Sequence, residues 1–353
     1  MRSIHEILNR QYYKKSSWIL ILLPLSFIYF LIIYFRIWAY RIGIFKSIKM
    51  DVPVVVIGNI TIGGTGKTPL VIWLLERLIK KGMKPGLICS GYNSNAKSPK
   101  EVLLDSKVSN VGDEALMIKL RFKKNYNKDI PIFVGKRKVH VGQALLESYP
   151  NVNILISDDG LQHYELERDF EIVVVDEARQ FGNKFLIPAG PLRESVSKIN
   201  EVDALVLNGH LNASEKYDSM IEKKNKNINE GLAFKMTYYA DVLVNCFNRD
   251  QIFNLDILAK KNLVAITGIG NPERFFNQLI AAKIPFIDTK IFNDHHVFTK
   301  SDFKIYSDMN IIMTEKDAVK CKKFVNINYW YLPIYVDLDE KLFKKMMKKL
   351  RIN

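Results

Sequence analysis

The residues best suited to chemistry lie in one glycine-rich string. In VVVIGNITIGGTGKTP a β-branched run leads into three glycines, and Lys67 and Thr68 follow at once. Glycines let backbone N–H groups turn towards a phosphate, and the start of a helix adds a favourable dipole. The lysine can reach terminal phosphates, and the hydroxyl can bind Mg²⁺. The string therefore predicts a phosphate-binding loop, or P-loop.

The P-loop prediction covers eight consecutive positions. The predicted nucleotide-binding residues are Thr61, Ile62, Gly63, Gly64, Thr65, Gly66, Lys67 and Thr68. The usual spacing has glycine at the first of these positions, where this chain has Thr61. The alternative is an ordinary corner between a strand and a helix, but such corners rarely carry this string.

A pair of aspartates ends a second apolar run, in the string ILISDDG. Asp158 and Asp159 resemble in position the acidic strand end that accompanies a P-loop and holds Mg²⁺ or its waters. A turn that begins at Asp159 is the structural alternative for one of them. We predict a metal site formed by Thr68 and the two aspartates. Gln162 and His163 follow directly and can orient this loop.

The elements that must position these residues alternate between strand and helix patterns, which is typical of a mostly parallel sheet covered by helices. The predicted strands are 52–57, 86–90, 153–157, 171–176 and 203–207, with a helix over 67–81. A second series of predicted strands covers 240–244, 263–267, 285–291, 311–314 and 330–336, and a final helix over 340–351 is predicted to pack on a sheet through one apolar face.

The composition of the chain changes at two places. Residues 18–35 carry no charge over a length close to that of a membrane-crossing helix, and residues 212–231 are polar and rich in Asn and Lys. These changes predict a membrane-anchor segment over 1–49, a P-loop core over 50–225 and a C-terminal α/β domain over 226–353.

The apolar segment has several interpretations. A cleaved signal peptide is one, but no small-residue cleavage pattern follows the run, so a retained anchor is favoured. Basic residues flank both ends, which gives no direction by the positive-inside rule. Pro24 is expected to kink the segment. Crossing the bilayer and dipping into one leaflet both stay open.

The charge of the chain points to an anionic partner. Its 52 Lys and Arg against 37 Asp and Glu give a formal net charge of +15. Nucleic acid, an anionic membrane surface and a phosphorylated substrate all fit such a charge. The lysines are dispersed and no nucleic-acid motif is recognisable, so nucleic acid is not expected, and no protein partner is evident. The three cysteines are widely spaced and indicate a reducing, cytoplasmic setting.

Together these strings resemble one family, the tetraacyldisaccharide 4′-kinases, which are the lipid A kinases of Gram-negative bacteria. The similar blocks are PLSFIY, GNITIGGTGKTP, VGDEA, DDGLQH, GNKFLIPAGPLRE, GIGNPERFF, FNDHHVF and TEKDAVK, in the family's order. Thr61 agrees with the family's own loop. At the end of the second strand the family usually has Ser-Arg-Gly-Tyr, whereas this chain reads Cys89-Ser90-Gly91-Tyr92. Ser90 therefore stands where the family usually has arginine.

The resemblance implies an α/β fold: a P-loop NTPase-like, mostly parallel sheet with helices on both faces, a smaller C-terminal α/β domain and an N-terminal membrane helix. It implies transfer of the ATP γ-phosphate, with Mg²⁺, to the 4′-hydroxyl of an acylated disaccharide 1-phosphate lipid. The implied location is the bacterial inner membrane, with the catalytic domains on the cytoplasmic face. The alternative function is a membrane-associated regulatory P-loop ATPase without a sugar-lipid substrate.

The resemblance also implies the catalytic residues. Asp113 in VGDEA matches the family's catalytic aspartate and His295 in NDHHVF its partner, which implies a pair drawn from both domains. A group that accepts the hydroxyl proton is what phosphoryl transfer to a sugar needs. From the sequence alone, a helix N-cap is the better interpretation of Asp113, and the resemblance reverses that preference. His295 and His296 are adjacent, but no third ligand is evident and zinc is not expected.

Four further residues match family positions. Arg193 and Glu194 fall in a block at the family's active site, and an arginine fork suits phosphate recognition. Glu114 and Arg137 match less securely and are equally well surface charges. The block from Thr314 to Asp317 also matches, but its chemistry has no assignment from the sequence.

Overall fold

The computed structural model describes residues 12–13, 17–91, 99–209, 233–255 and 263–352. Two compact units make up the chain. The first unit consists of Met1–Ile88, Arg137–Thr237 and Asp337–Asn353, and the second of Cys89–Lys136 and Tyr238–Val336. The predicted division into three consecutive segments stays a prediction. The predicted polar linker at 212–231 lies outside the described residues.

The first unit is built on a parallel sheet. Its strands run in the order β8-β7-β6-β1-β5-β2, and each neighbouring pair is parallel. All but β8 are buried along their whole length, which explains the continuous Val, Ile and Leu runs. The strands are β1 (Val54–Gly58), β2 (Pro85–Cys89), β5 (Ile154–Asp158), β6 (Phe170–Asp176), β7 (Ala204–Asn208) and β8 (Ala233–Tyr239).

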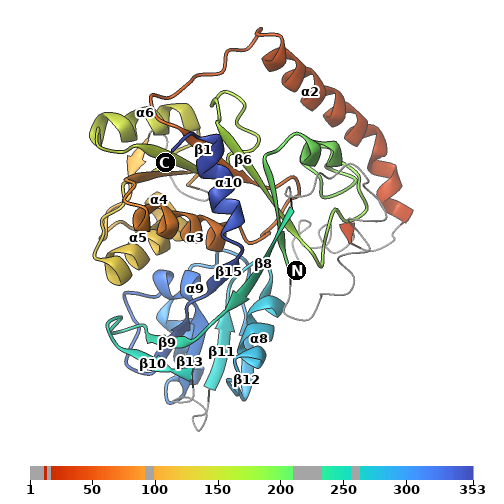
Figure 1. Cartoon of the computed structure of the whole chain (residues 1–353). Coiled ribbons are helices and arrows are strands. Elements are labelled where there is room, and N and C mark those ends of the chain that lie inside the picture. Colours follow the sequence, from red (N-terminus) through yellow and green to blue (C-terminus); the bar gives the residue numbers. More distant parts are fainter. Residues whose placement is uncertain (1–11, 14–16, 92–98, 210–232, 256–262, 353) are drawn as a thin grey trace. The chain divides into compact units, whose positions relative to one another are not determined.

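Helices cover this sheet, as predicted for an α/β fold (Figure 1). They are α3 (Lys67–Lys80), α6 (Lys138–Ser148), the short η2 (Val196–Asn200) and α10 (Lys341–Lys349). Packing is close: a Cβ added to Gly86 of β2 would lie 2.7 Å from the Leu145 side chain of α6. The final helix buries Leu342, Met346 and Met347, which is the apolar face that the sequence predicts.

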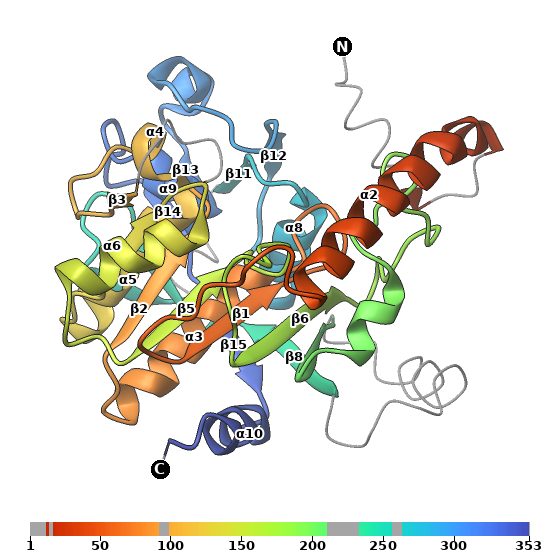
Figure 2. The same ribbon diagram turned by 90° about the horizontal axis from the view of Figure 1, so that it is seen from above.

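The apolar N-terminal segment forms a 3₁₀ turn, η1 (Ser17–Leu22), followed by α2 (Leu23–Arg41). Pro24 lies in the first turn of α2. Proline is tolerated there because the N–H it lacks would have no partner within the helix. Pro24 therefore lies where the segment changes from a 3₁₀ to an α-helix, and a kink of the run at this point stays a prediction, whereas Figure 2 shows α2 itself as one continuous helix.

Among the described residues, one helix, Ile19–Arg41, is long and apolar enough to cross a membrane by length and composition. Most of its large apolar side chains are exposed, among them Phe27, Ile28 and Phe35. One face instead contacts the rest of the first unit through Ser26. Its Oγ donates to Leu186 O at 2.9 Å and accepts from Ala189 N at 2.9 Å.

The second unit has its own six-stranded sheet, in the order β10-β9-β14-β13-β11-β12. β14, β13, β11 and β12 are parallel, and β9 and β10 are antiparallel to their neighbours. The strands are β9 (Val242–Asn245), β10 (Ile252–Asn254), β11 (Leu263–Thr267), β12 (Asp288–Ile291), β13 (Asn310–Thr314) and β14 (Tyr329–Leu332).

Alternate side chains of this sheet enter two separate cores. Leu263 and Ala265 pack with Phe275 and Leu279 on one face, and Val264 packs with residues of the opposite face. The covering helices are α8 (Pro272–Ala281), η4 (Lys300–Tyr306) and α9 (Glu315–Lys320). The segment Cys89–Lys136 adds β3 (Lys100–Glu101), α4 (Val108–Val111), α5 (Asp113–Tyr126) and β4 (Ile132–Val134).

The predicted strand over 330–336 is wrong as a single element. The chain forms β14, which ends at Leu332, and then β15 (Tyr335–Leu338). Pro333 lies between them. Proline has no N–H to donate to a strand ladder, so the pairing stops there.

Candidate active site

The glycine-rich string connects β1 directly to α3, as expected for a P-loop. Gly63 and Gly66 have φ of +97° and +92°, in the left-handed region where a Cβ is unfavourable. Gly66 immediately precedes the helix, so the free N–H groups of its first turn lie beside Lys67. This local geometry presents backbone donors and the positive end of the helix dipole at the loop.

Lys67 is held at the loop by two oxygen partners. Its Nζ donates to Asn59 Oδ1 at 2.9 Å and lies 3.3 Å from Asp159 Oδ1. The amide of Asn59 in turn donates to Thr61 O at 2.6 Å. Asn59, the first residue after β1, therefore fixes both the lysine and the loop backbone.

Thr65 is buried in the loop, and Asn208 at the end of β7 donates to its carbonyl oxygen at 2.6 Å. The Thr65 hydroxyl has no hydrogen-bond partner among the described residues. Asn208 thus adds a contact from a distant strand that the sequence analysis did not single out.

Asp159 combines an unusual backbone with two cationic partners. Its φ is +51°, and its carboxylate lies 3.3 Å from both Lys67 Nζ and Arg193 Nη1. Burial opposes its charge, but these cations and Lys138 lower the pKa of the Asp159 carboxyl well below its ordinary value. Asp159 is therefore ionised at neutral pH.

The predicted Mg²⁺ ligands are hard oxygen donors, which is the chemistry that Mg²⁺ prefers. Asp158 is buried at the end of β5, and Thr68 lies in the first turn of α3. Within the described part of the chain, no cluster of three or more His, Cys, Asp or Glu residues is arranged to hold a metal ion. Mg²⁺ usually takes one or two carboxylates and completes its shell with water and phosphate oxygens.

A hydrogen-bonded network next to Arg193 is formed by Gln162, Tyr164 and Glu194. Glu194 is 1% exposed and accepts from Gln162 Nε2 at 2.9 Å and from Tyr164 Oη at 2.6 Å. Gln162 also donates to Asn59 O at 3.2 Å. The structure thus brings the predicted residues Arg193, Glu194 and Gln162 to the P-loop. Tyr164 joins them without having been identified from the sequence.

The α2 helix contacts the same network. Tyr29 Oη donates to Arg193 O at 3.2 Å, and Arg36 Nη2 donates to Gln162 O at 3.0 Å. Tyr29, like Arg36, lies on the face of α2 that carries Ser26. The apolar helix is therefore connected by hydrogen bonds to the residues around the P-loop.

His163 and Lys138 lie beneath the aspartate loop. Lys138 is buried and donates to Ile88 O at 3.2 Å and to Asp158 O at 2.7 Å. Burial and the charge of Lys138 lower the pKa of His163 to about 4, so His163 is neutral at pH 7. Lys138 was not a sequence-based candidate, because a lysine near a helix start is usually solvated.

Arg137 does not join this site. Its side chain is 59% exposed, and its guanidinium pairs with Glu165. This placement matches the surface alternative that the sequence left open for this residue.

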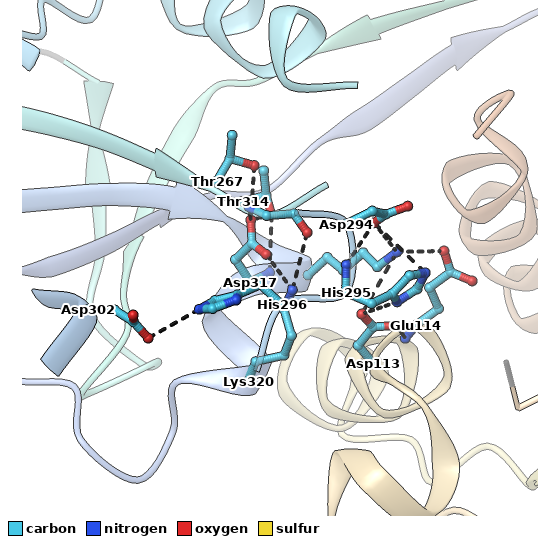
Figure 3. A network of polar contacts seen from close by, with 12 residues as sticks. Asp113, Glu114, Thr267, Asp294, His295, His296, Asp302, Thr314, Asp317 and Lys320 are labelled. Atoms are coloured by element: carbon cyan, nitrogen blue, oxygen red, sulfur yellow. Dashed lines mark hydrogen bonds and ion pairs between the residues drawn. The ribbon is translucent and has the colours of Figure 1, made fainter. Parts of the chain in front are cut away.

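The second unit brings Asp113 and His295 together. His295 Nδ1 lies 3.0 Å from Asp113 Oδ2, although the residues are 182 positions apart in the chain (Figure 3). Both residues belong to the second compact unit. Asp113 is the first residue of α5 and follows Gly112 in the N-cap position, and its Oδ1 accepts from Glu114 N at 2.9 Å.

The Asp113 carboxylate is buried, whereas the His295 side chain is 19% exposed. Burial disfavours the charged carboxylate, but the hydrogen bond to His295 and the nearby charge of Lys316 lower the pKa of Asp113. When an ionised carboxylate orients an accessible imidazole, that imidazole can accept a proton from a hydroxyl.

The two adjacent histidines have different partners. The His296 ring stacks on Phe292 with centroids 4.4 Å apart, and its Nε2 lies 3.2 Å from Asp302 Oδ2. His295 instead faces Asp113 (Figure 3). Glu114 lies beside this pair and accepts from Lys316 at 3.2 Å.

Comparison with known proteins places this chain in a family. A sequence model described as tetraacyldisaccharide-1-P 4′-kinase matches residues 18–351. The tetraacyldisaccharide 4′-kinase of Methylobacillus flagellatus is 40% identical over 349 residues, covering 99% of this chain and 97% of the relative. That of Pasteurella multocida is 38% identical over 342 residues, covering 96% and 97%.

A solved structure agrees. The crystal structure of LpxK from Aquifex aeolicus, in complex with ATP, is 27% identical in sequence and superposes with a TM-score of 0.77. The match covers 95% of this chain and 99% of the other. With a family match over residues 18–351 and relatives matched over nearly their whole length, the chain belongs to the tetraacyldisaccharide 4′-kinase family.

Proposed function

We propose that this protein is a kinase that transfers the γ-phosphate of ATP to the 4′-hydroxyl of a tetraacyldisaccharide 1-phosphate, a step of lipid A biosynthesis. The observation that carries this proposal is the family relationship over residues 18–351. The P-loop supports the proposal, because a kinase needs a nucleotide-binding site and the P-loop string is the most specific motif of the sequence.

The nucleotide site uses residues 61–68. Their backbone N–H groups surround the phosphates, and Lys67 places a positive charge on the transferred group. The Aquifex aeolicus relative was crystallised with ATP, which supports ATP as the donor. Thr68, Asp158 and Asp159 would hold Mg²⁺, which supplies charge to neutralise the phosphate oxygens.

Asp113 and His295 act together as the base. The imidazole is the more exposed member, and the buried carboxylate orients it through the 3.0 Å contact. The pair accepts the proton that the sugar hydroxyl loses on attack. Arg193 is assigned to phosphate recognition, because its guanidinium offers a fork of donors. Glu194 is assigned to positioning Gln162 and Tyr164, because its buried carboxylate accepts a hydrogen bond from each of them.

The exposed apolar side chains of α2 attach the protein to the membrane. Location at the inner membrane with the catalytic residues on the cytoplasmic face follows from the need for ATP. The net charge of +15 adds attraction to an anionic lipid surface.

The test is a reaction with purified full-length protein, ATP, Mg²⁺ and a tetraacyldisaccharide 1-phosphate in mixed micelles. Mass spectrometry is expected to show a lipid product heavier by one phosphate, and none with Lys67→Ala. Release of ADP at the same rate with and without the lipid, and no phosphorylated lipid, would support the regulatory ATPase instead.

A further inference from the structure

The block from Thr314 to Asp317 has no role in the function proposed so far. It covers the end of β13 and the start of α9. The structure places it directly beside the residues that hold Asp113 and His295 (Figure 3).

Asp317 fixes the loop that carries His295. It is fully buried and accepts hydrogen bonds from Thr267 Oγ1 at 3.0 Å and from Gly268 N at 3.1 Å. The carbonyl oxygen of Gly268 accepts from His295 N at 3.2 Å. Both sides of Gly268 are thus engaged, and His295 keeps a left-handed φ of +59°.

Lys316 faces the same pair from α9. Its ammonium lies 3.2 Å from Glu114 Oε1, 3.8 Å from Asp113 Oδ2 and 3.9 Å from Asp294 Oδ1. Its side chain is 17% exposed, so solvent screens these charges only in part. Burial opposes the positive charge, but the carboxylates of Glu114, Asp113 and Asp294 raise the pKa of Lys316 above its ordinary value.

We propose that Lys316 is a positioning residue for the Asp113–His295 pair, which it holds in its working arrangement through the charge of its ammonium group. This inference rests on the proposed function, because it assumes that the pair accepts the hydroxyl proton. Lys316 acts through Asp113 and the two neighbouring carboxylates.

The physical reason is the balance of charge around a buried carboxylate. Burial disfavours the ionised form of Asp113, whereas His295, Lys316 and Lys320 favour it, and the carboxylates of Glu114 and Asp294 share the Lys316 ammonium with it. Removing the Lys316 charge leaves three carboxylates with less compensation, so the pKa of Asp113 rises. The pair can accept a proton only while Asp113 is ionised and the pair as a whole is unprotonated, so activity is lost as the pH falls through the range in which the coupled pair takes up its proton.

The experiment compares Lys316→Met and Lys316→Arg with wild type in the lipid phosphorylation assay over a range of pH. Lys316→Met is expected to lower kcat by about 10-fold or more, the order of a general-base contribution that is impaired but not abolished. It is expected to move the acid limb of the kcat/KM profile to higher pH by about one unit, with an unchanged KM for ATP. Lys316→Arg keeps the charge and should retain the wild-type acid limb.

The matched control is Lys322→Met, which changes an exposed lysine just after α9. It should behave as wild type. A second comparison is made in an Asp113→Ala background, where Lys316→Met should have little further effect on kcat because the residue it acts through is gone.

A wild-type acid limb and kcat in folded Lys316→Met would overturn the inference, as would equal losses in the Met and Arg variants with unchanged pH dependence. If Lys316→Met does not fold, Lys316→Gln is measured in its place against the same outcomes. The proposed function is tested separately with the wild-type protein. If wild type does not phosphorylate the lipid, the proposed kinase function is refuted. If only the Lys316 inference is wrong, wild type still phosphorylates the lipid.

Discussion

At the scale of single residues, the predicted phosphate-binding lysine, Lys67, has two oxygen partners. Its ammonium donates to Asn59 and pairs with Asp159. We expect Lys67→Ala to reduce lipid phosphorylation by about 100- to 1,000-fold, the usual cost of losing one charged donor to a developing negative charge. The measurement is the initial rate at saturating ATP and Mg²⁺.

The melting temperature of Lys67→Ala is the accompanying control. It should stay close to that of wild type, because the lysine does not pack in a core. Near-normal turnover in the folded variant would refute the assignment of this loop.

The Asp113–His295 contact predicts non-additive kinetics. Each alanine variant is expected to lose about 100- to 10,000-fold in lipid phosphorylation, the range of general-base catalysis, and still to bind ATP. The double variant should lose far less than the product of the single losses, because residues that act as a unit are not independent. Rates and ATP affinities of the three variants give the measurement.

Two results would change this interpretation. Multiplicative losses would mean that His295 shapes substrate binding separately. Near-normal phosphorylation with a lower melting temperature in Asp113→Ala would assign Asp113 to stabilising the start of α5, and Asp158 or Asp159 would then be the next candidates for the base.

His163 predicts a dependence of stability on pH. Its pKa is lowered from 6.5 to about 4, so below pH 6.5 the unfolded chain binds a proton that the folded protein does not. The free energy of unfolding should therefore fall between pH 6.5 and pH 4, by at most about 3 kcal/mol from this residue.

Urea unfolding at several pH values measures this effect. His163→Asn should remove part of the fall, and His140→Asn, at an exposed histidine of α6, should not. Identical pH dependence in His163→Asn and wild type would contradict the assignment.

At the scale of elements, α2 combines an apolar surface with hydrogen bonds to the P-loop surroundings. Ser26 is buried and bonded to both Leu186 and Ala189. Ser26→Ala leaves a buried donor and acceptor without partners, and we expect it to lower the free energy of unfolding by about 1–3 kcal/mol. Ser148→Ala, at an exposed serine of α6, is the matched control for denaturant unfolding. Equal stability of the two variants would show that the α2 contacts contribute nothing.

The elements also show how far a sequence predicts this structure. Strands such as Leu263–Thr267 were predicted at the observed bounds, because buried parallel strands leave continuous β-branched runs. The helix over Lys138–Ser148 and the short strand Ile132–Val134 were missed, because a short element without strong periodicity depends on its tertiary neighbours.

The residues of the candidate site also differ in how far the sequence predicts them. Residues inside one string, such as Lys67 and Thr68, were identified by their spacing. Asp113 and His295 were paired only through the resemblance, because a contact across 182 positions leaves no local pattern. Asn208 and Lys138 were missed, since each acts by a hydrogen bond to a backbone carbonyl, which any segment can offer.

At the scale of the whole molecule, we expect deletion of residues 1 to about 40 to move the protein from the membrane to the soluble fraction. The reason is the loss of the exposed apolar side chains of α2. Membrane fractionation of the full-length and shortened proteins, each washed at low and at high salt, measures this. Unchanged, salt-sensitive association would assign attachment to the basic surface and its net charge.

The division of the chain into interleaved units affects its synthesis on the ribosome. The segment Cys89–Lys136 belongs to the second unit, whose other segment ends at Val336, roughly 200 residues later. At ordinary translation rates this segment waits about 10–40 s for its last partners. During that time α5 lacks α9, against which it packs in the finished second unit, so the nascent chain offers a binding site for a chaperone well before the kinase is complete.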